Sequence, residues 1–301
     1  MMLAVTGATG FVGERLLGAA RAAGHDVRAI TRRPMPPRAG VEWIGGALED
    51  RPALDRLCQG ADAVIHVAGV INARDHAAFE AGNVAGTAAI LAAAQSAGVP
   101  RFIHVSSLAA REPDLSRYGA SKARSEELVK TADMPFAIVR PPAVYGPGDR
   151  ETLELFRMAR RGLIALPPAG RLSLIHADDL AALMIALATS DIPDGLTVEP
   201  DDGHAGGYSH REFAALLGSA VRRRAVGVSF PQAILRTAAA LDGLIRRDGA
   251  KLTPDRVAYF CHPDWVADPA KAVAPSVWRP EIETARGLGQ TADWYREAGW
   301  L

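Results

Sequence analysis

Cysteine is scarce in this chain, aromatic residues are few, and neither sign of charge is in excess. The 301 residues include only two cysteines, Cys58 and Cys261, which lie far apart in the sequence. Two distant cysteines exclude a disulfide-stabilised scaffold and favour a reducing cytoplasm. Lysine plus arginine and aspartate plus glutamate number 34 each. These totals give no indication of nucleic acid or an anionic membrane as the main partner.

A long hydrophobic run is also lacking. The longest apolar stretch reads LAALMIALA, at residues 180–188, which is well short of the ~20 residues that a membrane span needs. We therefore expect no membrane-spanning segment. The chain starts MMLAVTG, and we expect no cleaved leader before the first strand. A hydrophobic content of 49% is ample for the core of one large domain or two small ones.

The first half of the chain alternates short apolar runs with helix-length segments. The runs that read as strands are residues 2–7, 26–32, 41–46, 63–69, 101–107 and 136–141. They are almost continuously apolar, as is typical of parallel strands covered on both faces. Strands that alternate with helices indicate right-handed crossovers. The pattern predicts an α/β fold with a Rossmann-type doubly wound parallel sheet.

The rhythm changes after about residue 146. Helical patterns there include residues 209–220, where Ser209 and Glu212 form a capping-box pattern, and residues 230–245. In the latter, Phe230, Ile234 and Leu241 fall on one apolar stripe, which favours a helix packed over a pocket, with contact to a membrane surface as the alternative. We expect a dinucleotide-binding domain at residues 1–150, to which residues 173–199 return. A smaller C-terminal substrate-binding lobe would comprise residues 151–172 and 200–301.

A glycine-rich turn links the first predicted strand to a helix. In AVTGATGFVGERLL, Gly7, Gly10 and Gly13 allow a tight turn and close approach of the backbone to a pyrophosphate. The helix start then supplies free N–H groups and the positive end of a dipole. Three glycines at this spacing, in the first strand-helix unit, predict a dinucleotide site.

The end of the second predicted strand indicates which dinucleotide binds. An acidic residue about 20 positions after the glycines would form a hydrogen bond with the ribose 2′-hydroxyl of NAD. The strand instead ends in Thr31, Arg32 and Arg33, and Asp26 lies at its other end. Two arginines can clamp a 2′-phosphate through charge-assisted hydrogen bonds. The sequence therefore favours NADP over NAD, with solvated surface arginines as the competing interpretation.

Several motifs together resemble those of the extended short-chain dehydrogenases/reductases, the group of NAD(P)-dependent epimerases and dehydratases. They are TGATGFVG, GADAVIHVAG, NVAGT, FIHVSS, YGASK, RPPAVYGPGD and LIHADDLA. The resemblance implies a catalytic set of Ser107, Tyr118 and Lys122, with Asn83 as the family's helical asparagine. It also implies contacts to the cofactor, beside Arg32 and Arg33, from Gly7, Thr9, Gly10, Phe11, Val12, Leu48, Ala68, Gly69, Lys122, Pro141 and Val144.

Departures from the family pattern reduce the number of reaction types that fit this sequence. Ala47 stands where relatives often have an aspartate that contacts adenine. The Thr-Asp-Glu set of dehydratases and the cysteine of relatives that epimerise next to a carbonyl are both missing. SSLAAREP is more similar to the reductase and hydroxysteroid dehydrogenase branches. The main hypothesis is a reaction on a small-molecule carbonyl/alcohol pair. A nucleotide-sugar 4-epimerase and a cofactor-binding regulatory or assembly subunit without turnover are the alternatives.

Helical spacing gives the catalytic set a chemical rationale. Tyr118 and Lys122 are four residues apart and would share one helix face. A neighbouring ammonium favours phenolate, so we expect a lowered pKa for Tyr118. Ser107, after a strand, could donate a hydrogen bond to a carbonyl oxygen as charge builds there.

Other features suggest no further chemistry. His176 precedes Asp178 and Asp179 at a helix start, but the sequence shows no cluster with zinc-ligand spacing, and we expect no metal. The alanine-rich helix 84–97 offers a contact for a homodimer.

Overall fold

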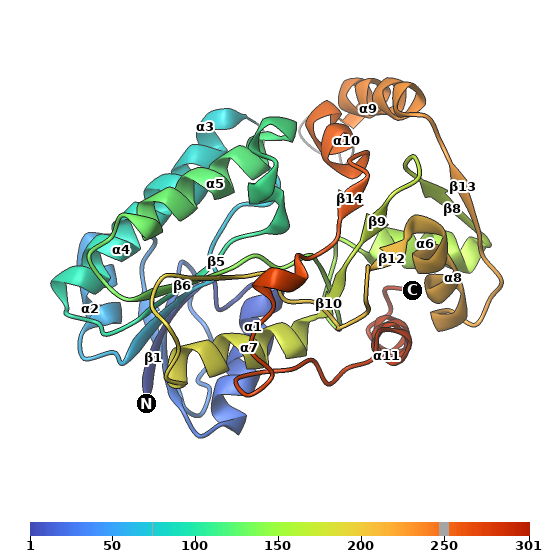
Figure 1. Ribbon diagram of the computed structural model, residues 1–301. Helices are drawn as coiled ribbons and strands as arrows, with labels where there is room; N and C mark the ends of the chain where they lie inside the picture. The colour runs from blue at the N-terminus through green and yellow to red at the C-terminus, as the bar shows by residue number, and fades with distance from the viewer. Residues whose placement is uncertain (74, 247–252) are drawn as a thin grey trace. The chain divides into compact units, whose positions relative to one another are not determined.

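The computed structural model describes residues 1–73, 75–246 and 253–301. The chain divides into two compact units (Figure 1). The first comprises Met1–Pro141, Asp178–Pro200 and Lys271–Arg279, and the second comprises Pro142–Ala177, Asp201–Ala270 and Pro280–Leu301. The role of the second unit as a substrate-binding lobe stays a prediction.

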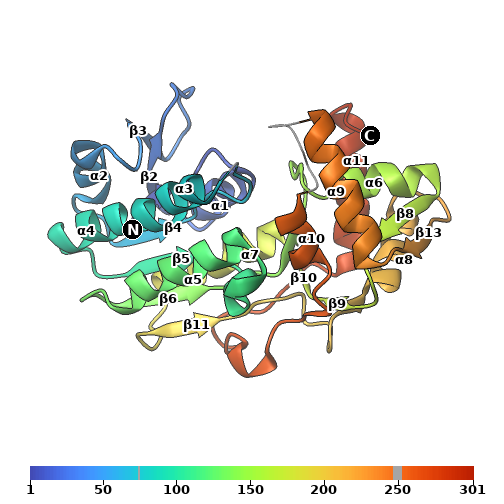
Figure 2. The same ribbon diagram turned by 90° about the horizontal axis from the view of Figure 1, so that it is seen from above.

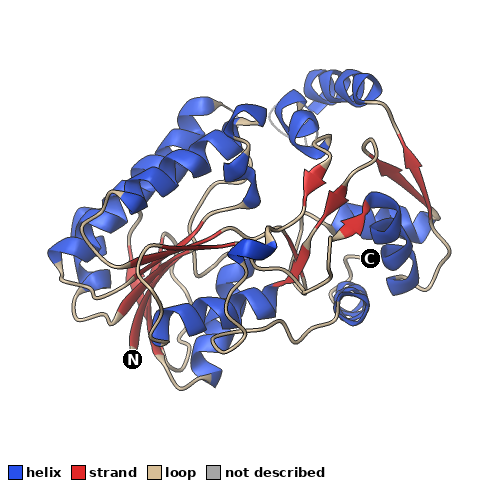
Figure 3. Cartoon of the chain, in the orientation of Figure 1, coloured by secondary structure: helices blue, strands red, loops and turns tan. Residues whose placement is uncertain are grey.

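A seven-stranded parallel sheet forms the centre of the first unit (Figure 3). Its strand order is β11-β6-β5-β4-β1-β2-β3. The strands are β1 Met2–Thr6, β2 Asp26–Thr31, β3 Val41–Gly45, β4 Ala63–His66, β5 Phe102–Val105, β6 Phe136–Val139 and β11 Leu196–Val198. The predicted α/β class and doubly wound parallel sheet are confirmed, and the six expected strands are β1 to β6. The edge strand β11 is too short to stand out as an apolar run.

The strand order fixes where a ligand can bind. From β1 the chain proceeds outward to β2 and β3, and then returns to β4 on the other side of β1. The crevice at such a switch point, beyond the carboxyl ends of the strands, is where open α/β sheets bind ligands. Residues that directly follow β1, β2, β4, β5 and β6 therefore meet at one edge of the sheet.

Helices cover both faces of this sheet (Figures 1 and 2). On one face lie α2 Arg51–Cys58, α4 Gly86–Ser96 and α5 Arg117–Lys130, and on the other lie α1 Phe11–Ala22 and α7 Ala177–Thr189. Leu54, Leu57, Ile90, Val64 and Phe102 pack in one core cluster between the first face and the sheet. The apolar strands are thus buried on both sides, which explains their near-continuous hydrophobicity.

One helical stretch among the described residues, His76–Ser96, is long and apolar enough to cross a membrane by length and composition alone. It comprises α3 His76–Phe79, a π-helical segment Glu80–Ala85 and α4. Ile90 and Leu91 of this stretch belong to the core cluster of the first unit. Its apolar character is therefore explained by packing against the sheet.

In its described residues, the second unit combines short strands with five α-helices (Figure 1). β7 pairs with β10, β9 with β12 and β14, and β8 with β13. Phe156, Phe213, Leu217, Leu288 and Tyr295 belong to its core cluster. The strands are β7 Ala143–Tyr145, β8 Leu163–Leu166, β9 Arg171–Leu172, β10 Leu174–His176, β12 Tyr208–Ser209, β13 Val226–Ser229 and β14 Asp264–Trp265. The helices are α6 Leu153–Arg161, α8 His210–Ala220, α9 Gln232–Arg246, α10 Pro254–Phe260 and α11 Thr284–Glu297.

Two sequence expectations for this unit have different outcomes. The capping box is confirmed, because the Ser209 side chain accepts from the Glu212 amide and the Glu212 carboxylate accepts from the Ser209 amide. The packing of α9 over a pocket stays a prediction, and Ile234 and Leu241 on its apolar stripe are 53% and 54% exposed. Periodicity identifies an apolar face but does not say what covers it.

Two histidines lie buried within the parallel sheet, on β4 and β5. His66 is fully buried, and its ring nitrogens bond the hydroxyls of Thr6 at 2.6 Å and Thr87 at 3.0 Å. His104 stacks on His66, with ring centroids 5.5 Å apart, and bonds Ser125. Burial, with a smaller effect of the Lys122 charge, lowers the pKa of His66 to about 3. Both causes also place the pKa of His104 well below its usual range.

This burial predicts acid lability. A histidine whose pKa is lowered on folding binds fewer protons in the folded state, so stability falls as the pH drops below the unfolded value near 6.5. Lowering the pH from 7 to 5 should reduce the free energy of unfolding by about 2 kcal/mol through His66 alone. Denaturant titrations at both pH values would measure this loss. The loss should shrink in His66→Gln and persist in His76→Gln, whose histidine is exposed. Equal pH dependence in all three proteins would contradict it.

Candidate active site

The turn after β1 packs so tightly that only glycine fits it. Gly7 has φ +74°, and a Cβ there would lie 2.6 Å from the Ala68 backbone nitrogen. A Cβ on Gly13 would lie 2.1 Å from the Gly7 carbonyl oxygen. Such contacts leave no room for a side chain, so strand, turn and helix are pressed together as a dinucleotide cradle requires. This close packing supports the interpretation of these glycines as part of a dinucleotide-binding turn.

The helix that follows this turn begins without a side-chain cap. Gly10 is the N-cap residue of α1, and it supplies no side-chain hydrogen bond to the first amides. The first turn of a helix carries N–H groups without partners inside the helix, and these favour an anion. Thr9 and Gly10 are exposed, whereas Phe11 and Val12 are partly buried.

Asn83 fastens the loop after β4 to helix α5. Its Nδ2 donates to the Val70 carbonyl at 2.9 Å and to Ser121 Oγ at 2.8 Å, while its Oδ1 accepts from the Val70 amide at 2.6 Å. A Cβ on Gly69 would lie 3.1 Å from Asn83 Oδ1, so the loop backbone packs closely against this amide. Asn83 lies in the π-helical segment Glu80–Ala85, a distortion that is frequent at functional sites.

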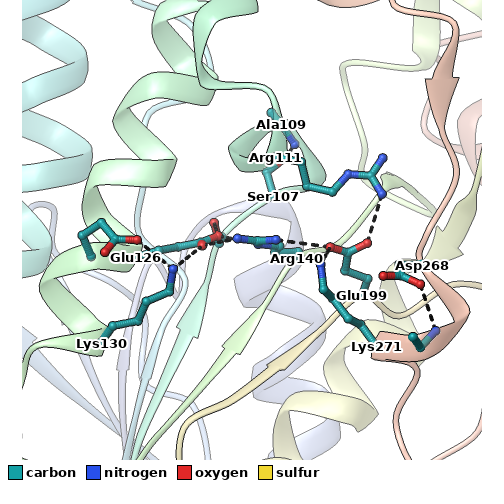
Figure 4. A network of polar contacts seen from close by, with 12 residues as sticks. Ser107, Ala109, Arg111, Glu126, Lys130, Arg140, Glu199, Asp268 and Lys271 are labelled. Carbon is teal, nitrogen blue, oxygen red and sulfur yellow. Dashed lines mark hydrogen bonds and ion pairs between the residues drawn. The ribbon is translucent and has the colours of Figure 1, made fainter.

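Ser107 lies just beyond β5, as the sequence predicts. It is 8% exposed, and as N-cap of the short 3₁₀ helix Leu108–Arg111 its Oγ accepts from the Ala109 amide at 3.2 Å (Figure 4). The hydroxyl is therefore held in one orientation by the backbone. Its own proton remains available for a second partner.

Tyr118 begins α5 and meets Ser107 across the sheet edge. The two side chains form a hydrogen bond that lowers the pKa of the phenol, but burial has the larger effect and raises that pKa above its usual value. The expectation of a lowered pKa for Tyr118 is therefore wrong for this structure. Burial disfavours the phenolate more than the neighbouring groups favour it.

Lys122, one turn further along α5, is 4% exposed. Its Nζ donates to the Val105 carbonyl at 2.8 Å, at the end of β5. Burial lowers its pKa to about 8, against an opposing effect of the Glu126 carboxylate. A Cβ on Gly69 would lie 3.9 Å from Nζ, so the ammonium also reaches the loop after β4. The structure thus brings Ser107, Tyr118, Lys122 and Asn83 together at one edge of the sheet.

A buried network of charges is centred on Glu126, Arg140 and Glu199 (Figure 4). Arg140, the last residue before Pro141, forms two hydrogen bonds to Glu126, from Nε at 2.8 Å and from Nη2 at 2.6 Å. Ser106 Oγ donates to Glu126 Oε1 at 2.6 Å. Glu126 lies on α5, Ser106 after β5 and Arg140 after β6. The network therefore joins β6 to the two elements that carry Ser107, Tyr118 and Lys122.

Glu199 extends the network on the other side of Arg140. It accepts from Arg140 Nη1 at 3.3 Å, from Arg111 at 3.1 Å and from Lys271 at 3.2 Å. The side chains of Glu199 and Glu126 are 0% and 1% exposed. Two buried carboxylates are thus each neutralised by hydrogen-bonded cations, which a water-excluded site requires.

Sequence reasoning missed this network. Glu126 is four residues after Lys122, so helical spacing already placed it on the inner face of α5. Arg140 interrupts an otherwise apolar strand end, and a charge in such a place needs a partner. The partner Glu199 is 59 residues further along the chain, and no local pattern connects the two.

The remaining predicted cofactor residues lie at several places. Arg32 and Arg33 directly follow β2 and are exposed. Leu48 is partly buried against the core cluster, where it constrains Gly86. Pro141 is buried at the end of β6 and its carbonyl accepts from the Leu108 amide at 3.1 Å. Val144 lies on β7 in the second unit.

No group of three or more His, Cys, Asp or Glu residues in the described part of the chain is arranged to hold a metal ion. His176 is buried and packs edge-on against Tyr145, at 5.3 Å between ring centroids. The structure therefore provides a packing contact for this histidine.

Comparison with known proteins identifies the family. The chain belongs to the NAD dependent epimerase/dehydratase family, whose model matches residues 3–196. It is an NAD(P)-dependent enzyme of the redox or epimerase type, as the motifs predicted.

Curated relatives include two reductases. The chain is 39% identical to a ceramide reductase of Caulobacter vibrioides, over 100% of this chain and 96% of that protein. It is 29% identical to a (4-alkanoyl-5-oxo-2,5-dihydrofuran-3-yl)methyl phosphate reductase of Streptomyces griseus, over 91% and 100% of the two chains.

A solved structure with a similar fold is that of the Bordetella bronchiseptica enzyme WbmG in complex with NAD. Its TM-score is 0.77 at 22% identity, over 100% of this chain and 95% of that one. At this identity the likeness shows the fold alone.

The buried network predicts a large and specific loss of stability. Glu126→Gln keeps the shape but leaves Arg140 buried with one carboxylate fewer, which should cost on the order of 3 kcal/mol of unfolding free energy. The side chain of the neighbouring Glu127 is 68% exposed and pairs with Lys130, so Glu127→Gln should change stability by less than about 0.5 kcal/mol. Denaturant unfolding of both variants measures the difference. Similar losses of stability in the two variants would contradict a special contribution of the buried Glu126–Arg140 network.

Proposed function

We propose that this protein is an NADP-dependent oxidoreductase that transfers a hydride between nicotinamide and a carbonyl/alcohol substrate. The observation that carries the proposal is the hydrogen bond between Ser107 and Tyr118, with Lys122 one turn away, at the same sheet edge as the glycine cradle. Binding alone would not require a phenol paired with a hydroxyl at that point. This favours turnover over a purely regulatory or assembly role.

The residues at the sheet edge fit a dinucleotide. Gly7 and Gly13 allow the turn to pack closely on its neighbours, so that the free amides at the start of α1 would bind a pyrophosphate, and Lys122 would hold the nicotinamide ribose. Ala68, Gly69 and Pro141 would complete the contacts, together with Thr9, Gly10, Phe11, Val12, Leu48 and Val144. When bound, the cofactor supplies or accepts the hydride.

The protein supplies the proton and stabilises charge at oxygen. Because burial raises its pKa, Tyr118 holds its proton at neutral pH and can donate it to a carbonyl oxygen that becomes an alkoxide. Ser107 donates a second hydrogen bond to that oxygen as its negative charge develops. The buried Lys122 ammonium favours the resulting phenolate. This assignment suits the direction of reduction.

One relative supports a substrate class. The full-length similarity to a ceramide reductase supports a carbonyl on a long-chain lipid. A nucleotide-sugar 4-epimerase uses the same Ser-Tyr-Lys set. Three epimerases of similar fold are 17–20% identical to this chain, however, and at such identity the likeness supports the fold and not that reaction.

Removal of the Tyr118 hydroxyl tests the proposed proton transfer. Tyr118→Phe should lower NADPH-dependent reduction of a long-chain amino ketone on the order of 10²–10⁴-fold, as is typical of general acids. Cofactor affinity should change little, because the ring stays. Tyr208→Phe removes a phenol that bonds Asp202 in the second unit and serves as the control. Near-native turnover in Tyr118→Phe, measured by NADPH absorbance, would disprove the assignment.

The choice of cofactor rests on two arginines. A hydrogen bond to a charged group contributes roughly 1.5–3 kcal/mol, which corresponds to a ~10–150-fold preference for the 2′-phosphate. Replacing Arg32 and Arg33 by alanine should weaken NADPH binding by that factor and leave NADH binding nearly unchanged. Arg21→Ala, at an exposed arginine on α1, is the control. Equal affinity of the native protein for both cofactors in calorimetric titration would contradict the proposal.

A further inference from the structure

Exposed apolar side chains are concentrated in one part of the second unit. Eight large hydrophobic residues in the described chain are exposed, and six of them lie between residues 163 and 260. Five belong to the paired strands β8 and β13 and to helix α9, which follows β13 directly (Figures 1 and 2). They are Leu163, Val226, Val228, Ile234 and Leu241, with exposed fractions of 36–55%.

The same elements carry an excess of positive charge. Residues 160–166 and 222–242 contain six arginines and one acid, Asp242 on α9, although the two signs balance over the whole chain. All six are exposed: Arg160, Arg161, Arg222, Arg223, Arg224 and Arg236. One of them, Arg222, lies 3.6 Å from Asp293. The chain therefore has a basic region although its formal net charge is zero.

The arginines and the apolar strands adjoin one another. Arg160 and Arg161 end α6 and lead through Gly162 into β8, and Arg222, Arg223 and Arg224 precede β13. A Cβ on Gly162 would lie 3.9 Å from Arg223 Nε, which places the two basic segments side by side. We define the basic apolar surface as these six arginines with the five exposed hydrophobic residues.

We propose that the basic apolar surface docks on an anionic lipid bilayer. Aliphatic side chains flanked by arginines match the boundary between acyl chains and negatively charged headgroups, where interfacial segments bind. A second copy of the chain is a poorer occupant, because a symmetric interface would bring two sets of six arginines together. A nucleic-acid backbone is also a poorer occupant, because it is bound through charged and polar contacts that aliphatic side chains cannot make.

Co-sedimentation with vesicles tests the proposal without cofactor or substrate, so its outcome is independent of the proposed reaction. The protein should bind vesicles of phosphatidylcholine with phosphatidylglycerol, bind much less to phosphatidylcholine alone, and release as salt is raised. Arg223→Gln with Arg224→Gln should weaken binding about 10–30-fold, because each arginine near an anionic surface contributes on the order of a fivefold factor. Ile234→Ser with Leu241→Ser should weaken it at least about tenfold.

Matched controls come from the first unit. Arg21→Gln with Arg51→Gln removes two exposed arginines, and Ile71→Ser removes an isoleucine that is 55% exposed. These controls should retain binding, and thermal unfolding verifies the fold of every variant. The proposal is overturned by absence of vesicle binding or by equal losses in the controls. It is also overturned if light scattering shows a dimer that only the surface variants dissociate.

Discussion

The buried pairing of Glu126 with Arg140 is the constraint on which the candidate site depends. Glu126 projects from α5, Arg140 terminates β6, and Ser106 joins them from the end of β5. A buried carboxylate that lost its guanidinium would be strongly disfavoured, so these three elements cannot shift independently. Because Ser107 follows Ser106 and Lys122 precedes Glu126 by one turn, the network fixes the hydroxyl and the ammonium relative to each other.

The cradle on the other side of the switch point depends on packing in place of charge. Gly7, Gly13 and the backbone at Ala68 approach so closely that any Cβ would collide, while Asn83 ties the next residues of that loop to α5. Charge fixes the acid-base residues and close backbone contact fixes the turn that would bind phosphate. Both are built on adjacent parallel strands, so a cofactor and a carbonyl bound there would be held in one geometry.

Much of the first unit could be predicted from sequence, because local patterns encode it. Apolar runs gave six strands, glycine spacing gave the turn after β1, and helical spacing gave the shared face of Tyr118 and Lys122. Long-range effects were not accessible: Glu199 reaches Arg140 across 59 residues, and the Tyr118 pKa is raised because burial outweighs its neighbours. The α9 stripe was visible in the sequence, but its exposure was not.

The source of the hydrogen in the product tests the proposed reaction most directly. The purified protein would be incubated with NADPH that carries deuterium at the transferable position of nicotinamide, together with a long-chain amino ketone, and the product analysed by mass spectrometry. The account predicts an alcohol with one deuterium on the carbinol carbon and one NADP⁺ formed per alcohol. Inversion of a sugar-nucleotide hydroxyl without net cofactor consumption, and no label in any lipid alcohol, would contradict it.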